Sequence, residues 1–587
     1  LLPRSVFLTR AVPAVISLAV PLSMGLALRD FFKARLWWAA PVFMAAVPAW
    51  FLHSRTAFET SLGISMFSLF LYFYLCYRLK HRRYLPWAFL FGALAFYAYS
   101  PLQLVVVLTG VVLLVVDWRY HWADRRGLLR SLAILALLAA PYVRFRLQYP
   151  EALSQHLTQL RSYWVSSQPL GVKIGEFLRR YLHGFSPAYW FLPNSSDLIR
   201  HQMKGLGHMR LISLPFVLVG LVMALHRLKD PAWRVVLVAL LVAPTGAALV
   251  DVAITRLLVM IIPLGYLALL GMEQLIAWLA QKHTQLAACW VGVVFALLWT
   301  ALSVSMTADA LKNGPTWYED YGLYGMQWGG ETLFEEIKAF MQAHPDKEIH
   351  LSPSWANGTD VIARFFLGDP LPIQMGTIEP YTLYQLPLDE QIVFVMTPEE
   401  YGWIPTTGKF TDVEVLQCLP YPNGKCGFYF VTLRYIDGVE EIFAREQAER
   451  RKPEQAELEL LGQKVSVSYS PLDIGQIAQI FDGDPKTFIR SFEANPLEIT
   501  LSFSQPVELH GVSVLIGNAA SLLEVEVSSP DQLVPQQFSA EIGAQEAYRT
   551  LSVPFGSALQ VQSLRLRLYD LAQSEPGHVH LWEVSLE

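Results

Sequence analysis

The chain has 587 residues, of which 53% are hydrophobic and 16% are charged. A chain of this length predicts several domains. The formal net charge of −5 lacks the basic balance typical of nucleic-acid-binding proteins, so no nucleic-acid partner is expected. Apolar runs fill the first half, whereas most acidic residues lie in the second half. We therefore expect a membrane half, with the lipid bilayer as its partner, followed by soluble domains.

Ten apolar runs predict a polytopic α-helical membrane domain of about ten transmembrane helices over residues 1–305. Several runs are shorter than the roughly 20 residues of a perpendicular span, but flanking Trp, Tyr, Lys and Arg make up the difference. Buried core helices of a large soluble protein are disfavoured, because no amphipathic partners accompany the runs. The runs are Ala11–Leu28, Trp37–Phe51, Leu62–Tyr77, Leu85–Tyr99, Leu102–Val116, Leu128–Val143, Leu211–Leu225, Val235–Val250, Leu257–Ile276 and Leu286–Val304.

Lys and Arg gather in alternate short loops, which the positive-inside rule places in the cytoplasm. The insert His53–Glu59, the long loop 144–210 and everything after Val304 then lie outside, in a multi-pass plasma-membrane protein with extracytoplasmic C-terminal domains. Both chain ends also lie outside, and we expect a further span before Leu1. The basic loops hold Arg29–Arg35, Arg78–Arg83, Arg119–Arg130, Arg227–Arg234 and Lys282.

The polar insert between two apolar runs is the first candidate site. It contains His53, Arg55 and, four residues later, Glu59. Ionisable residues are costly near hydrocarbon, and they indicate a functional site by default. The alternative is an interfacial Arg55–Glu59 pair that only anchors two helix ends.

A second basic cluster ends the long outer loop. One interpretation is a solvated loop that touches lipid headgroups, and the other is a pocket for a phosphorylated lipid. Arg256 begins a later apolar run, where its guanidinium could bind a phosphate bidentately or pair with Asp251. The loop cluster comprises Arg200, His201, Lys204, His208 and Arg210.

Five stretches within residues 1–305 together resemble the polytopic GT-C glycosyltransferases. The closest resemblance is to the bacterial family 39 group, which is related to protein O-mannosyltransferases and aminoarabinose transferases. It rests on the order of the apolar runs and on short, degenerate motifs. The stretches are Thr9–Leu18 (TRAVPAVISL), His53–Glu59 (HSRTAFE), Phe91–Leu104 (FGALAFYAYSPLQL), Gly184–His208 (GFSPAYWFLPNSSDLIRHQMKGLGH) and Ile254–Gly271 (ITRLLVMIIPLGYLALLG).

This resemblance implies an enzyme of the cell envelope that moves a hexosyl or pentosyl group from a polyprenyl-phosphate sugar to a glycan, lipid or protein acceptor outside the membrane. The family's catalytic Asp or Glu lies in the first outer loop, a position expected before Leu1 and absent from this sequence. Glu59 would assist, through a divalent metal or by orienting the acceptor. The donor phosphate would be held by Arg55, Arg256, Arg200 and His201.

A second hypothesis is a non-catalytic, membrane-anchored glycan-binding or scaffold protein. An Asp or Glu soon after a span upstream of Leu1 would favour the enzyme, and its absence would favour the scaffold. A transporter would predict inverted repeats, and the sequence contains none that we can recognise.

Residues 306–438 predict a small extracytoplasmic α/β domain, because short helical and strand patterns alternate there. Cys418 and Cys426 flank a hairpin signal at Asn423-Gly424. On an external domain they could form a disulfide, or remain two free thiols on facing strands. The charge-rich residues 439–460 predict a linker or an exposed helix.

Residues 461–587 predict an all-β sandwich, because apolar residues recur with period two between turn residues. The segments Ile480–Ser491 (IFDGDPKTFIRS) and Leu581–Glu587 (LWEVSLE) are similar to the discoidin or coagulation-factor C-terminal jelly roll, which also serves as a carbohydrate-binding module. That resemblance implies a structural Ca²⁺ held by Asp482, Asp484, Thr487 and Glu583. The alternative is an Asx turn at Asp482-Gly483 without an ion.

Overall fold

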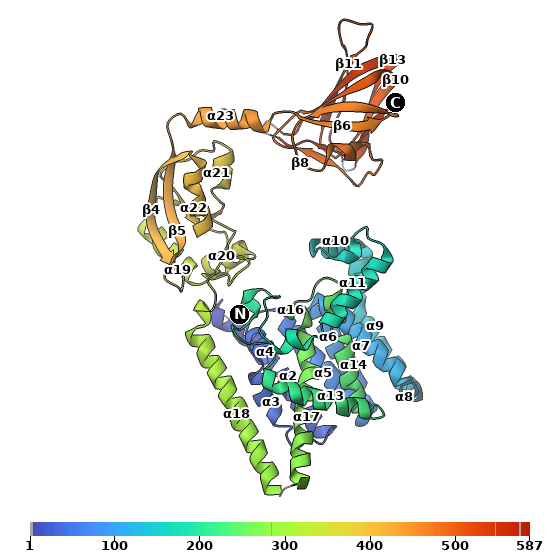
Figure 1. The fold of residues 1–587 in the computed structure, drawn as a ribbon, viewed down its shortest axis with the longest axis vertical. Coiled ribbons are helices and arrows are strands. Elements are labelled where there is room, and N and C mark those ends of the chain that lie inside the picture. The colour runs from blue at the N-terminus through green and yellow to red at the C-terminus, as the bar shows by residue number, and fades with distance from the viewer. Residues whose placement is uncertain (1–3, 283–284, 546–547, 574–576) are drawn as a thin grey trace. The chain divides into compact units, whose positions relative to one another are not determined.

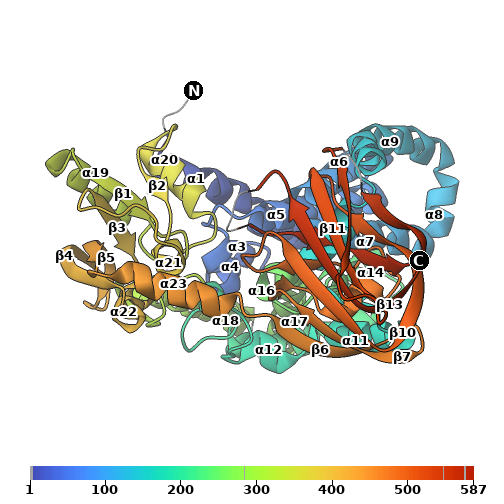
Figure 2. The same ribbon diagram turned by 90° about the horizontal axis from the view of Figure 1, so that it is seen from above.

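The computed structural model describes residues 4–282, 285–545, 548–573 and 577–587. Leu1, expected outside the membrane, is not among them. The chain divides into two compact units, and helices dominate the first whereas strands dominate the second (Figures 1 and 2). The first unit comprises Leu1–Thr377, Gln391–Tyr401 and Val415–Thr432, and the second comprises Ile378–Glu390, Gly402–Glu414 and Leu433–Glu587.

The helices up to Lys312 form a bundle whose side chains build one large apolar core. Their bounds are α1 Val6–Ser17, α2 Ala19–Asp30, α3 Ala39–Ala45, α4 Pro48–His53, α5 Glu59–Leu79, α6 Leu85–Ala98, α7 Ser100–Val116, α8 Trp118–Ala123, α9 Arg125–Gln148, α10 Ala152–Gln159, α11 Leu170–His183, α12 Pro187–Phe191, α13 Leu214–His226, α14 Pro231–Val242, α15 Thr245–Ala248, α16 Ile254–Leu257, α17 Ile261–Lys282 and α18 Gln285–Lys312. Short 3-10 turns include η1 Arg82–Tyr84 and η3 Ile199–His201.

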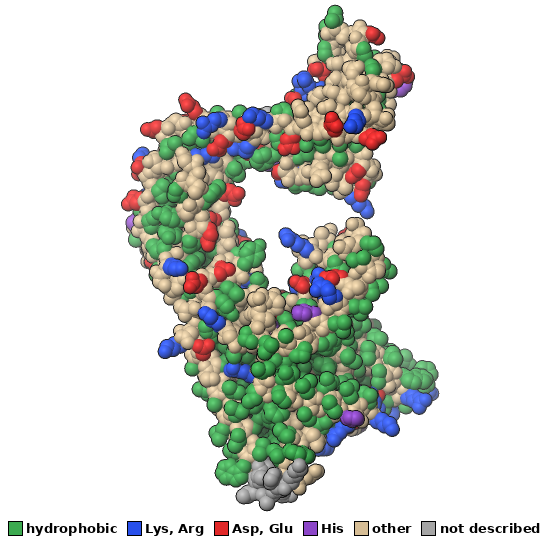
Figure 3. All heavy atoms as spheres, in the orientation of Figure 1, with side chains coloured by type: hydrophobic (Ala, Val, Ile, Leu, Met, Phe, Trp, Pro, Cys, Tyr) green, Lys and Arg blue, Asp and Glu red, His purple; other side chains and the backbone are tan. Residues whose placement is uncertain are grey.

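Six stretches of the described chain, rather than the ten expected, form helices long and apolar enough to cross a membrane. Two shorter apolar helical stretches, Ser100–Val116 and Leu211–His226, accompany them. Apolar side chains cover the face of the bundle seen in Figure 3, which fits a multi-pass membrane protein. The six are Val6–Asp30, Glu59–Leu79, Arg125–Gln148, Pro231–Ala248, Ile254–Leu279 and Trp290–Lys312.

Prolines explain part of the difference between the ten expected spans and the six helices that are long enough to cross a membrane. The predicted span Trp37–Phe51 is broken into α3 and α4, because Val47 is extended immediately before Pro48. The predicted span Leu85–Tyr99 yields the 14-residue α6, because Tyr99 is extended before the Ser100-Pro101 start of α7.

Two glycines allow α13 and α17 to pack backbone against backbone. A Cβ added at Gly220 would lie 2.0 Å from the carbonyl oxygen of Leu267, and one added at Gly271 would lie 2.0 Å from that of Phe216. Small residues at such crossings are typical of helix packing in membranes. This pair therefore fixes the central crossing of the bundle.

The predicted α/β domain contains a five-stranded sheet in the order β2-β1-β3-β5-β4. β1 pairs in parallel with β2 and β3, whereas β5 pairs antiparallel with β3. Cys418 and Cys426 form a disulfide across the β4–β5 hairpin, which decides between the two alternatives for these thiols. The elements are α19 Thr332–Ala343, β1 Glu348–Leu351, α20 Thr359–Leu367, β2 Gln374–Met375, α21 Glu379–Leu383, β3 Ile392–Met396, α22 Pro398–Thr407, β4 Phe410–Pro420 and β5 Cys426–Tyr435.

The C-terminal region has the expected strands, with a seven-stranded sheet and a three-stranded sheet around one apolar core. Two of the period-two runs, Leu497–Phe503 and Val512–Gly517, lie in the single strand β10, which pairs with β13 through two register shifts. The strands are β6 Glu454–Leu460, β7 Gln463–Tyr469, β8 Leu472–Ile474, β9 Ile489–Ser491, β10 Leu497–Ile516, β11 Ser521–Ser528, β12 Gln536–Ile542, β13 Arg549–Asp570, β14 His580–Leu581 and β15 Glu583–Leu586.

The segment 439–460, expected as a linker or exposed helix, has two structures. Val439–Arg450 forms helix α23, and Glu454–Leu460 forms β6, an edge strand of the seven-stranded sheet. β6 pairs with β7 in an antiparallel hairpin that turns at Leu461-Gly462. The charged side chains of β6 alternate with Ala456, Leu458 and Leu460, which pack on the core. The segment forms a strand despite its high charge, because pairing with β7 stabilises it.

Candidate functional site

Two polar regions lie at opposite ends of the parallel helices α5 and α7. At the start of both helices, Tyr99 lies beside Thr60 and Thr255. We call this the loop end, and it consists of His53–Glu59, Asp197–Arg210 and Asp251–Arg256. At the other end of both helices, Arg78 contacts Asp117. We call that the Asp117 end, and it consists of Arg78–Arg83, Asp117–Asp124 and Arg234.

The buried carboxylate of Asp197 organises the loop end. It accepts hydrogen bonds from His208 at 2.9 Å and from the backbone N–H of Ile254, the first residue of α16, at 2.6 Å. Burial opposes ionisation of Asp197, but the hydrogen bond and charge of His208 and the N–H of Ile254 outweigh it and lower its pKa. The cluster Arg200–Arg210 is therefore a built loop, not the solvated segment that was one alternative.

Two histidines stack within this loop. The rings of His53 and His201 are nearly parallel with centroids 5.3 Å apart. His53 Nδ1 donates to the Ala49 carbonyl, so its Nε2 accepts from His201 Nδ1 at 3.3 Å. Burial lowers the pKa of His53 to about 4 and that of His201 to about 3. His201, expected as a phosphate ligand, is therefore neutral at pH 7 and keeps a lone pair on Nε2.

Four half-buried arginines at the loop end have no carboxylate within ion-pair distance among the described residues. Arg55 stacks on the Phe51 ring at 3.7 Å, and Arg200 donates to the carbonyls of Leu323 and Gly325. Arg210 donates to the carbonyls of Ala46 and Leu302, and Arg256 to that of Asp251. Burial lowers the pKa of Arg55, Arg200 and Arg210 from a very high value, which leaves these side chains cationic.

The two ion pairs considered from sequence at this end do not form. The Asp251 carboxylate is exposed, accepts from the N–H of Val252 and faces Arg180 at 3.8 Å rather than Arg256. Glu59 is exposed in the first turn of α5 and makes no ion pair with Arg55 in the described part of the chain. Within the described part of the chain, Arg256 thus donates a side-chain hydrogen bond only to the Asp251 carbonyl.

The structure brings some of the predicted residues together and separates others. Glu59 and Arg256 both lie close enough to Tyr99 for their charges to act on its hydroxyl, and His201 packs against Phe58. Arg200 reaches a separate segment, Leu323–Gly325. Sequence reasoning missed Tyr99 and Asp197. The sequence feature that could have indicated Tyr99 is its position just before Ser100-Pro101, where a helix is interrupted. Nothing in the sequence distinguishes Asp197 from the other polar residues of its loop.

At the Asp117 end, the two half-buried arginines have a carboxylate partner, and so does the exposed Arg82. Arg78 and Arg234 both bind the Asp117 carboxylate, whose side chain is 4% exposed, and Arg82 binds Asp124 at 3.2 Å. His121 also contacts the hydroxyls of Tyr74 and Tyr77. These contacts brace α5, α7 and α14.

The four residues expected to hold Ca²⁺ lie together in the C-terminal region. The Thr487 hydroxyl is 3.1 Å from both Asp482 carboxylate oxygens and 2.9 Å from the Asp484 carbonyl. Burial and the neighbouring Asp482 carboxylate raise the pKa of Glu583, and Glu583 Oε1 is buried with no hydrogen-bond partner. Among the described residues no three His, Cys, Asp or Glu side chains form a metal-binding group, so any cation would need hydroxyl and carbonyl ligands too.

No family model and no curated protein matches this chain. The crystal structure of ArnT from Cupriavidus metallidurans bound to undecaprenyl phosphate is similar over 73% of this chain and 84% of that one, at 13% identity and a TM-score of 0.44. CpGH89CBM32-6 of Clostridium perfringens is similar over 21% of this chain and 92% of that one, at 15% identity and a TM-score of 0.17. The CBM32 of AlyQ, in complex with 4,5-unsaturated mannuronic acid, is similar over 22% and 98%, at 14% identity and a TM-score of 0.17. At these values the likenesses carry no conclusion about function.

Proposed function

We propose that the membrane half is a glycosyltransferase that binds a polyprenyl-phosphate sugar at the loop end. The observation that carries the proposal is the set of four half-buried arginines without carboxylate partners. Such cations are costly to bury unless an anion compensates them. A phosphate monoanion or dianion on an apolar chain supplies that charge and also suits the surrounding bilayer. The resemblance of the sequence to polytopic glycosyltransferases points to the same ligand.

Five residues at the loop end have assigned roles in this proposal. Arg256 and Arg55 hold the donor phosphate and stabilise the charge that develops as the sugar leaves. Arg200 supports the loop through its carbonyl contacts. His201 is a neutral hydrogen-bond acceptor, and Glu59 orients the acceptor hydroxyl. No three metal-ligating side chains gather here among the described residues, so no step is assigned to a divalent metal.

Binding of a polyprenyl phosphate to the purified chain in nanodiscs tests the anion site. Arg256→Gln is expected to weaken binding about tenfold or more, because a hydrogen bond to a charged group contributes roughly 1.5–3 kcal/mol. Arg179→Gln is the matched control, because Arg179 is exposed and already paired with Glu176 at 2.6 Å. Equal affinity of the unaltered chain, Arg256→Gln and Arg179→Gln for polyprenyl phosphate would contradict the proposal.

Release of polyprenyl phosphate from a radiolabelled polyprenyl-phosphate sugar tests the chemistry separately. We expect turnover to fall in Glu59→Gln and Arg256→Gln, whereas binding falls only in the arginine variant. Retained binding without turnover for any donor sugar or acceptor would favour the membrane-anchored, non-catalytic protein.

An aromatic cleft in the C-terminal region favours glycan binding as a second function. The cleft has a volume of about 850 Å³ and is lined by Phe488, Tyr548, His580 and Trp582 together with polar groups such as Asp570. The Trp582 ring stacks on Phe488 at 5.2 Å and meets Tyr548 at 4.9 Å. Rings beside hydrogen-bonding groups suit a sugar. Trp582→Ala is expected to abolish binding of envelope oligosaccharides in a glycan array, and unchanged binding would contradict this function.

We also propose that Ca²⁺ binds beside this cleft. Two adjacent carboxylates, the Thr487 hydroxyl and the unpartnered Glu583 Oε1 are hard oxygen ligands of the kind that Ca²⁺ prefers. Calorimetric titration of the full chain with CaCl₂ is expected to show one site that Glu583→Gln removes. Glu541→Gln, at an exposed position of β12, is the control. Binding that survives Glu583→Gln would contradict the assignment.

A further inference from the structure

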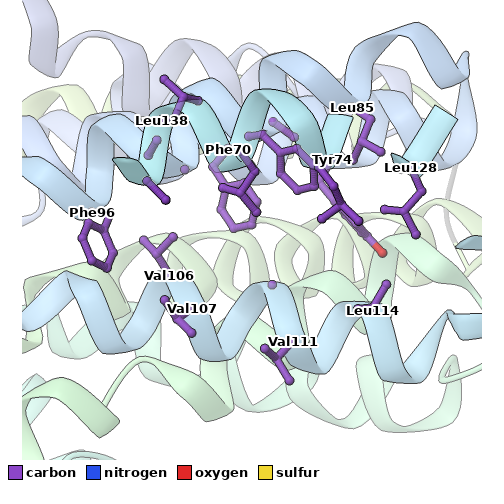
Figure 4. Close-up of a pocket in the computed structure, with 18 of the residues that line it drawn as sticks. Phe70, Tyr74, Leu85, Phe96, Val106, Val107, Val111, Leu114, Leu128 and Leu138 are labelled. Carbon is purple, nitrogen blue, oxygen red and sulfur yellow. The ribbon is translucent and has the colours of Figure 1, made fainter. Parts of the chain in front are cut away.

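An apolar slot runs along the helical bundle from the neighbourhood of Tyr99 toward the Asp117 end. It has a volume of about 490 Å³ and lies between α6, α7 and α9, with α5 as its floor. Figure 4 shows it extending from Phe96 and Leu138 at one end to Leu85, Leu114 and Leu128 at the other. Interiors of proteins are normally packed without such space. A slot of this size therefore fits a ligand.

The wall formed by α9 has little protein support. Only 6% of the most apolar stretch within Arg125–Gln148 is buried by the protein, compared with 89% of the corresponding stretch within Ile254–Leu279. Both views place α8 and α9 at the edge of the bundle (Figures 1 and 2). Leu132, Leu138 and Tyr142 of α9 line the slot. In a bilayer, the hydrocarbon that reaches such an open slot comes from lipid.

One end of the slot is polar and basic. His121 lines it, and the Tyr74 hydroxyl points toward that end in Figure 4. The slot-lining Leu85 follows Arg82 and Arg83, and the slot-lining Leu128 follows the exposed pair Arg125 and Arg126. The exposed rings of Trp118 and Trp122 on α8 are typical of a membrane interface. This end therefore combines hydrocarbon with positive charge at headgroup level.

We propose that the slot binds an acyl chain of an anionic phospholipid, with its headgroup against Arg125 and Arg126. The charge of these arginines complements a phosphate diester, and juxtamembrane basic residues attract anionic lipids. The basic end of the slot adjoins the Asp117 end of the bundle. The other end of the slot, at Phe96 and Tyr97, comes shortly before Tyr99 at the loop end. Competition with added polyprenyl phosphate therefore decides between this lipid and the proposed sugar donor.

Gly110 provides a way to fill the slot. It lines the slot, and a Cβ added there would meet no atom within 4 Å. The Gly110→Trp side chain can therefore enter the slot without moving the backbone. Leu218→Trp is the matched control, because Leu218 is an exposed residue of α13 outside the slot.

Native mass spectrometry of the chain, released from nanodiscs containing phosphatidylglycerol and phosphatidylcholine, tests the proposal. We expect the unaltered chain and Leu218→Trp to retain phosphatidylglycerol, and Gly110→Trp to lose it. Arg125→Gln with Arg126→Gln is expected to remove the preference for phosphatidylglycerol over phosphatidylcholine. The proposal would be overturned if Gly110→Trp retained phosphatidylglycerol, or if added polyprenyl phosphate displaced phosphatidylglycerol from the unaltered chain.

A second measurement keeps the test independent of folding of the variant. Photoactivatable phosphatidylglycerol, incorporated with the unaltered chain, should crosslink to peptides from α7 and α9. Crosslinks confined to other helices would overturn the proposal.

Discussion

The two ends of the bundle differ in how their arginines are compensated. At the Asp117 end, Arg78 and Arg234 share one buried carboxylate. At the loop end, the partners of Arg55 and Arg256 among the residues that the structure describes are a ring face and a carbonyl. A cation paired within the protein holds helices together, whereas a cation left without a counter-charge is free for a ligand. Charge balance, more than the presence of charge, separates a structural cluster from a candidate site.

The largest effect is expected from removing the shared carboxylate. Asp117→Asn leaves Arg78 and Arg234 without their counter-charge, which should lower the free energy of unfolding by about 3–5 kcal/mol. Chemical denaturation of the purified chain in detergent measures this change in the free energy of unfolding. Asp251→Asn is the control, because its carboxylate is 73% exposed and should matter little. Equal costs in the two variants would show that Asp117 is not a brace.

A smaller effect should distinguish arginines at the two ends. Arg78→Gln removes one charged hydrogen bond to Asp117 and should cost about 1.5–3 kcal/mol of unfolding free energy. Arg55→Gln breaks no ion pair and should cost less than about 1 kcal/mol, yet weaken polyprenyl phosphate binding. The comparison fails if Arg55→Gln destabilises the chain as much as Arg78→Gln.

The stacked histidines predict a pH dependence confined to the loop end. Their pKa values, about 4 and about 3, lie below the unfolded value of 6.5, so the unfolded state binds protons that the folded state does not. Stability from this pair is full above pH 6.5 and is lost as the pH falls toward 4. The hydrogen-exchange protection factors of peptides from Asn194–Arg210 should therefore fall as the pH is lowered from 6.5 toward 4.

His201→Gln should weaken this pH dependence, because it removes one of the two titrating rings. His226→Gln, at an exposed position of α13, should leave it unchanged. Protection factors that do not vary with pH in the unaltered chain would mean that the two rings are not neutralised by burial.

The smallest stability effect is expected at Glu59. Its carboxylate is exposed in the first turn of α5, where it interacts with the helix dipole by less than about 1 kcal/mol. Glu59→Gln should therefore change the melting temperature little. A large loss of stability would assign Glu59 to the structure rather than to an acceptor site.

Local pattern predicted many elements of this chain. The alternating helical and strand patterns expected over residues 306–438 correspond to elements such as α20 and β3. The alternating runs after residue 461 became strands, because period-two burial is a property of neighbouring residues. The predicted grouping of Asp482 with Glu583 came from a motif whose two parts lie about 100 residues apart, and the structure places them side by side.

The sequence by itself determined the apolar helices, the period-two strands and the basic character of the loop end, because each depends on residues close together in the chain. Only the tertiary structure decided which charges are compensated. The Asp251 carboxylate faces Arg180 rather than Arg256, and Asp197 pairs with His208 and caps α16. Counter-charges and buried hydrogen bonds join residues distant in sequence, and their energies depend on burial, which no local pattern contains.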